Sequence, residues 1–123
     1  MTIIEAINKI DQLKPNHYTQ LDKIKWLSDL DGRIKTEIID THESGNDVVF
    51  SGYNELTPHD TKLIASGQYE DLYIKWLEAN IDYTNGEYQS YNNSVTAFNT
   101  LYASFERYYN RQNMPKSQKL KFF

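Results

Sequence analysis

The stretch YQSYNNSVTAFNTLYASFERYY, residues 88–109, decides the fold of this chain. Its large side chains recur at spacings of three and four, which keeps them on one face of a helix of about six turns. We call this face the aromatic seam, and its members are Tyr88, Tyr91, Val95, Phe98, Tyr102, Phe105 and Tyr109. Such a seam packs more often on its own domain than on another subunit. Packing on another subunit is the alternative, and the tyrosines suit it because a tyrosine can bury its ring and leave its hydroxyl in water.

The composition is that of one domain of 123 residues with ten tyrosines and no cysteine. The lack of cysteine excludes a disulfide scaffold and a thiol nucleophile, and it favours a protein assembled inside a cell. Residues 1–13 lack the basic start of a secretion signal, and no stretch approaches the roughly 20 apolar residues that span a bilayer. We therefore expect a soluble protein made in the cytoplasm, without membrane contact.

The net charge of −4 is unevenly distributed along the chain. Residues 111–123 carry four basic side chains and no acidic one, so the preceding residues hold 9 basic and 17 acidic side chains. An acidic body is a poor non-specific binder of nucleic acid. The basic end therefore predicts a contact with an acidic protein surface, and the alternative is a solubilising tail.

Two helices are expected in the first third of the chain. Thr2 followed by Glu5 predicts a capped helix over residues 2–13, which Pro15 ends. Thr19 with Asp22 predicts a second cap. An apolar stripe then continues to about Asp40 through Leu21, Ile24, Leu27, Leu30, Ile34 and Ile38.

The periodicity fails over residues 41–68, where turn residues surround the β-prone piece Val48-Val49-Phe50. A loop of this length without structure is improbable in a compact domain, so we expect a short strand or hairpin there and an extended run at residues 61–65. The segment is either ordered by a partner or packed over the bundle.

Two further helices complete the expected fold. Ser66 can cap the third, whose apolar face leaves Asp82 outside. Gly86 then favours an antiparallel hairpin with the helix of the aromatic seam, although one long bent helix is the alternative. The seam helix should end near Asn110, ahead of Met114-Pro115. The sequence thus predicts a mainly α four-helix bundle at residues 1–112, followed by a basic, extended tail at 113–123.

Residue types that carry catalysis are poorly grouped in this sequence. Asp40-Thr41-His42-Glu43 is the closest approach to a metal site, but no second histidine follows at helical spacing. Asp82 and Glu87 are expected at the surface, where they could pair with Lys75 or Arg107. We therefore predict a protein that is not an enzyme and that holds neither metal nor cofactor.

Several motifs resemble a family of small proteins encoded in the head-gene clusters of tailed phages and prophages of Gram-positive bacteria. They are YIKWLEANIDY at 73–83, NGEY at 85–88, YNNS at 91–94, FN at 98–99, YYNR at 108–111 and MP at 114–115. Earlier in the chain, KWL at 25–27, LDG at 30–32 and IIDTHE at 38–43 are similar to the same family. The resemblance covers nearly the whole chain.

The resemblance implies a head–tail connector, also called a neck adaptor, which is a structural protein of the virion neck. Such proteins are small helical bundles that form a ring below the portal protein, continue the DNA channel without a specific nucleic-acid site, and support the next neck or tail component. The resemblance places the portal contact, or a contact with a neighbouring subunit, in the C-terminal segment. The candidate contact residues are Arg107, Tyr108, Tyr109, Asn110, Arg111, Lys116, Lys119, Leu120, Lys121, Phe122 and Phe123.

Two alternatives remain open. A tail-completion or tail-terminator subunit would also form rings, but it is more often built on a mixed sheet. A small enzyme or nucleic-acid binder would have to use Asp40, His42, Glu43 and Arg107.

Overall fold

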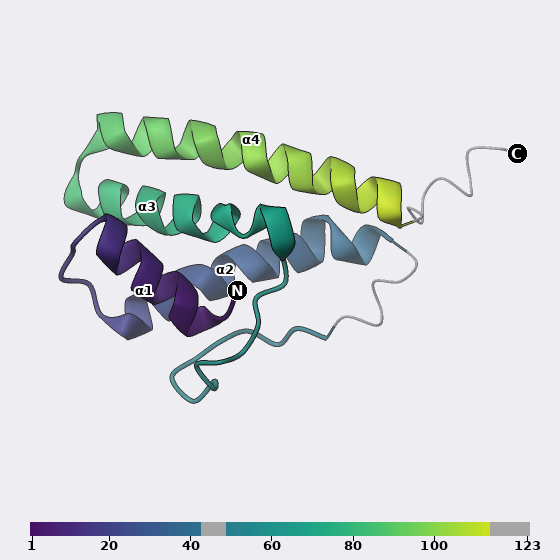
Figure 1. Ribbon diagram of the computed structural model, residues 1–123, viewed down its shortest axis with the longest axis horizontal. Helices are drawn as coiled ribbons and strands as arrows, with labels where there is room; N and C mark the ends of the chain where they lie inside the picture. Colours follow the sequence, from purple (N-terminus) through teal and green to yellow (C-terminus); the bar gives the residue numbers. More distant parts are fainter. Residues whose placement is uncertain (43–48, 114–123) are drawn as a thin grey trace, which may run out of the picture.

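The computed structural model describes residues 1–42 and 49–113, and it is mainly helical (Figure 1). The α-helices of this described part are α1 (Ile3–Leu13), α2 (Gln20–Glu37), α3 (Asp71–Asn85) and α4 (Tyr88–Gln112). Two short 3-10 turns, η1 (Ile39–Thr41) and η3 (Gly67–Tyr69), flank the irregular segment between α2 and α3. The four-helix bundle expected from the sequence is confirmed. The expectations for residues 43–48 and for the tail from residue 114 lie outside the described residues.

The first two helices begin at the capping residues that the sequence indicates. The Glu5 amide donates to Thr2 Oγ1 at 3.2 Å, and the Thr2 amide donates to the Glu5 carboxylate at 2.9 Å. Thr19 and Asp22 form the same reciprocal pair at 3.1 and 3.2 Å. Each pair satisfies two amides that the first helical turn leaves without a partner, and this fixes where α1 and α2 start.

Helices α3 and α4 form the expected antiparallel hairpin and lie side by side along their length (Figure 1). Gly86 ends α3 in the left-handed conformation at φ 77°, which costs glycine little because it has no Cβ. The amide of Gly86 then donates to the Tyr83 carbonyl at 3.1 Å, and that of Glu87 donates to the Asp82 carbonyl at 2.9 Å. These bonds turn the chain back within two residues.

The start of α3 differs from the expectation that Ser66 caps it. Helix α3 begins at Asp71, and the Ser66 side chain makes no capping hydrogen bond. The reason is Gly67, whose φ of 64° is incompatible with a right-handed helix. The chain makes the short turn η3 first and enters α3 afterwards.

The centre of the aromatic seam belongs to the core. Phe98, Tyr102 and Phe105 are buried against side chains of the other helices. Tyr88, at the first turn of α4, is 60% exposed. The seam is therefore a core face in its middle and open to solvent at its N-terminal end.

Asp82 contradicts the expectation that it lies at the surface, because it is fully buried. The Lys14 ammonium lies 2.5 Å from Asp82 Oδ1, and Ser94 Oγ donates to Oδ2 at 3.2 Å. The hydrogen bond with this carboxylate raises the pKa of Lys14. A paired carboxylate can be buried at acceptable cost, and this one joins the end of α1 to the α3–α4 hairpin. Lys75 pairs with Glu78 instead.

Residues 49–66 pack along the bundle without forming a strand or hairpin, so that expectation is wrong for Val49 and Phe50. The extended run is confirmed at its start, where Leu63 donates to the Met1 carbonyl at 2.9 Å beside a single antiparallel bridge between Thr2 and Lys62. Helix side chains satisfy other amides of the segment. Ser28 Oγ, for example, accepts from the Tyr53 amide at 3.0 Å. Individual hydrogen bonds, rather than the repeated pairing of a β-sheet, therefore hold this segment against the helices.

The main anchor of this segment is Asp31, which is fully buried in α2. Its carboxylate accepts hydrogen bonds from the Tyr53 hydroxyl at 2.5 Å, the Tyr73 hydroxyl at 2.6 Å and the Ile64 amide at 3.1 Å. The Tyr73 hydroxyl in turn accepts from the Ala65 amide at 2.6 Å. We call Asp31, Tyr53 and Tyr73 the aspartate anchor. It joins α2, α3 and the irregular segment at one point.

The aspartate anchor predicts a loss of stability in alkali. Burial, followed by the nearby charge of Asp31, raises the pKa of Tyr73 far above its ordinary value. The stability that neutral Tyr73 contributes is therefore complete below the unfolded-state pKa of about 10 and is lost as pH rises above it. Urea unfolding measured from neutral pH to about pH 11 should show this decline only above about pH 10. A Tyr73→Phe variant should show a shallower one, and an equal slope in both proteins would contradict the prediction.

Candidate partner-binding site

The structure brings five of the predicted contact residues together on the last turns of α4, and they are Arg107, Tyr108, Tyr109, Asn110 and Arg111. The remaining six lie outside the described residues, namely Lys116, Lys119, Leu120, Lys121, Phe122 and Phe123. The described part of the site is therefore one helix end and the elements packed beside it.

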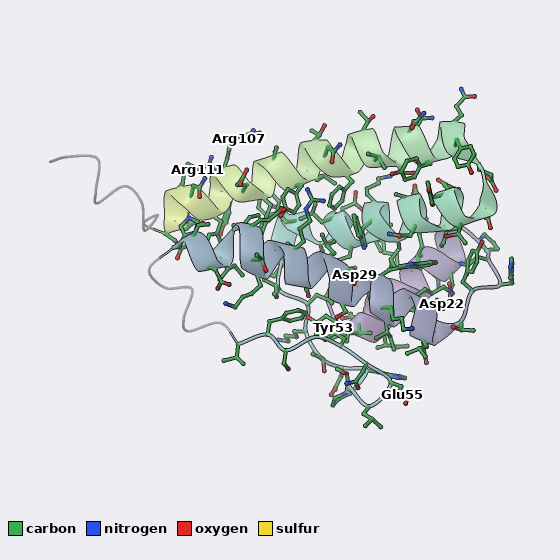
Figure 2. The ribbon with its side chains drawn as sticks, turned by 180° about the vertical axis from the view of Figure 1, so that it is seen from behind. Asp22, Asp29, Tyr53, Glu55, Arg107 and Arg111 are labelled. Atoms are coloured by element: carbon green, nitrogen blue, oxygen red, sulfur yellow. The ribbon has the colours of Figure 1, made fainter. Side chains whose placement is uncertain are left out.

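Arg107 and Arg111 lie one helical turn apart and are both exposed. Figure 2 shows them at the end of the bundle where α4 finishes. Arg107 contacts the Ser104 hydroxyl at 3.3 Å. Neither arginine forms an ion pair with a described residue. This helix end thus presents two positive charges to solvent.

Tyr108 and Tyr109 are half-buried and hold the helix end in place through ring contacts. Tyr108 stacks on Tyr69 of η3 with ring centroids 5.1 Å apart. Tyr109 meets the edge of the His42 ring at 4.7 Å. Both rings therefore pack against other side chains of the domain, and only part of each is available to a partner.

Asn110 is exposed, yet it contacts the buried His42. His42 Nε2 lies 2.7 Å from the Asn110 amide oxygen, and Nδ1 lies 2.6 Å from the Ile38 carbonyl. Each ring nitrogen of His42 thus faces an oxygen that accepts hydrogen bonds. His42, which the sequence offered as a metal or catalytic candidate, thus joins the end of α2 to the end of α4.

An aromatic hollow of about 330 Å³ opens between these elements. We call it the α4-end hollow. Its lining is mainly apolar and aromatic but includes three polar residues, and it consists of Ile39, Ile64, Ser66, Tyr69, Phe105, Tyr108, Tyr109, Gln112 and Asn113. A more open depression of about 500 Å³ adjoins it, shares Tyr69 and Tyr108, and reaches Arg111. An apolar floor with an arginine on its rim suits an apolar side chain that has a carboxylate beside it.

Sequence reasoning did not find this hollow. Its walls come from the seam, from η1, from η3 and from the irregular segment, which are far apart along the chain. It also missed a second groove of about 370 Å³ between α3 and α4, lined by Trp76, Tyr83, Tyr91 and Phe98 together with Arg33 of α2. The Arg33 guanidinium lies 4.5 Å from the centre of the Tyr102 ring, so part of that groove wall is already engaged within the domain.

Comparisons with protein-family models, with curated proteins and with solved structures found no match. Within residues 1–42 and 49–113, no group of three or more His, Asp or Glu residues could hold a metal ion. No helix of the same ranges has the length and apolar character needed to cross a bilayer.

Proposed function

We propose that this chain is a structural subunit of a phage neck, a head–tail connector that forms a ring below the portal protein and links the DNA-filled head to the tail. The observation that carries the proposal is the end of α4, which carries exposed Arg107 and Arg111. Arg111 lines the depression beside the α4-end hollow, and the sequence from residue 114 onward is basic. The sequence resemblance supplies the class of assembly. The proposed role is non-enzymatic, and the proposed location is the virion neck.

The shape and charge of the domain suit a ring subunit. Each copy in a ring must offer surfaces to two neighbours and to the components above and below. A bundle with a buried core of aliphatic and aromatic side chains supplies a rigid body for those contacts, and its net negative charge repels the packaged DNA that passes through the channel. The mainly helical fold favours this role over the tail-completion alternative, which is more often built on a mixed sheet.

Removal of residues 116–123 tests the portal contact. We expect the shortened protein to keep its melting temperature, because terminal basic residues rarely contribute to a core. We also expect it to lose binding to its proposed partner, a phage portal protein, measured by co-sedimentation. Lys9→Glu, a charge reversal on the exposed face of α1, is the matched control and should bind normally. Full binding by the shortened protein would contradict the proposed contact.

A further inference from the structure

A tight turn at residues 54–57 projects from the irregular segment and carries Leu56, which is 85% exposed. Three hydrogen bonds stiffen it. The Asn54 amide donates to Thr57 Oγ1 at 2.8 Å, the Leu56 amide donates to Asn54 Oδ1 at 2.8 Å, and the Thr57 amide donates to the Asn54 carbonyl at 3.1 Å. A single exposed leucine is common on protein surfaces. A leucine held on a rigid turn beside a carboxylate is a better defined feature, and we call it the Leu56 turn.

The base of the Leu56 turn is fixed to the bundle. Tyr53, the residue before the turn, donates through its hydroxyl to buried Asp31 and through its amide to Ser28 Oγ. Its ring also meets the Phe50 ring edge-on at 5.0 Å. The turn therefore loses little conformational entropy when it binds, which favours its use as a contact element.

The Leu56 turn and the α4-end hollow are complementary in charge and character. Residues 49–61 carry Glu55 and Asp60 and no lysine or arginine, whereas residues 107–113 carry two arginines and no acid. The hollow has room for a leucine side chain, and Arg111 stands on the adjoining rim. Leu56 seated in the hollow would bring Glu55 to the arginine side of the helix end.

These two surfaces belong to different corners of one molecule. Figure 2 shows Glu55 far from Arg107 and Arg111, on the opposite side of the bundle. The turn of one copy can therefore meet the hollow of a second copy but not its own. Two different patches that pair in this way make a head-to-tail contact, which repeats into a ring when the rotation closes.

We propose that Leu56 of one copy inserts into the α4-end hollow of the next copy and that Glu55 pairs there with Arg111. This inference rests on the proposed ring and assigns its subunit contact, which leaves residues 116–123 for the portal. One apolar side chain and one exposed ion pair form a weak contact. A closed ring repeats this contact at every subunit boundary, so the ring is held more tightly than any single pair of copies.

Charge reversal with rescue tests this contact. Sedimentation velocity of the full chain should show association that grows from micromolar to millimolar protein and weakens with added salt. Glu55→Arg alone, Arg111→Glu alone and Leu56→Asp alone should each weaken association on the order of tenfold or more. A mixture of the Glu55→Arg and Arg111→Glu proteins should recover it. Each variant alone has like charges at the two ends of the contact, whereas alternating copies of the two variants bring opposite charges together at every contact. Lys9→Glu is the control for a change of net charge.

Circular dichroism and melting temperatures establish that every variant is folded before association is compared. Wild-type protein that stays monomeric at millimolar concentration would overturn the inference, and so would single variants that associate normally or a mixture that fails to recover. Portal binding is measured on the same variants. If the portal binds normally and the charge reversals leave association between copies unchanged, this contact alone is rejected. If the wild-type protein does not bind the portal, the proposed function is rejected.

Discussion

Replacing Asp31 by alanine should destabilise the domain by about 3–5 kcal/mol. The substitution leaves three donors without an acceptor, namely the buried Tyr73 hydroxyl and the partly buried Tyr53 hydroxyl and Ile64 amide. Folding removes the Tyr73 hydroxyl from water and partly shields the other two groups, and Asp31 is the acceptor that each of them uses. Urea unfolding followed by circular dichroism measures the loss.

Asp29→Ala is the matched control for this prediction, because Asp29 is an exposed aspartate on the same helix (Figure 2). It should change the free energy of unfolding by less than about 0.5 kcal/mol. A variant that carries Asp31→Leu with Tyr53→Phe and Tyr73→Phe removes both hydroxyl donors, and it should regain part of the stability. If Asp31→Ala costs no more than Asp29→Ala, the aspartate anchor does not hold the irregular segment.

The double substitution Tyr102→Ala with Phe105→Ala should cost on the order of 5 kcal/mol or more and leave little folded protein at room temperature. Both rings are buried in the core, and Phe105 packs against Tyr69 with ring centroids 5.3 Å apart. The Tyr102 hydroxyl also donates to Glu37 at 2.8 Å, so its loss removes a link between α2 and α4. Equilibrium unfolding of the double and single variants gives the cost and its additivity.

Tyr88→Ala provides the comparison within the same seam. Tyr88 is exposed, so its truncation should leave stability nearly unchanged. Unchanged stability of the Tyr102 and Phe105 double variant, together with lost association between copies, would show that the middle of the seam is an interface and not core.

Local patterns in the sequence predict the helices and their ends well. The Thr2 and Thr19 caps, the left-handed Gly86 and the central seam residues depend on neighbours within a few positions, which periodicity and capping chemistry can capture. Ser66 failed as a cap because the adjacent Gly67 adopts positive φ, a backbone choice that the residue type permits without requiring.

Buried polar groups could not be predicted in the same way. The partners of Asp31 lie 22, 33 and 42 residues along the chain, and an aspartate inside a helix is indistinguishable from a solvated one until those partners are in place. Asp82 was placed at the surface for the same reason, since its partner Lys14 comes from a distant part of the sequence. The stacking of Tyr108 on Tyr69 and the contact of His42 with Asn110 are equally non-local. The helix that carries the candidate site was therefore predictable, but its hollow was not.

Electron microscopy of this protein mixed with its proposed partner, a phage portal protein, tests the connector role most directly. The proposed function predicts a ring that caps the exit of the portal and disappears when residues 116–123 are removed from an otherwise folded chain. Portal particles that remain bare with the full-length protein, at concentrations where both components are folded and soluble, would contradict it.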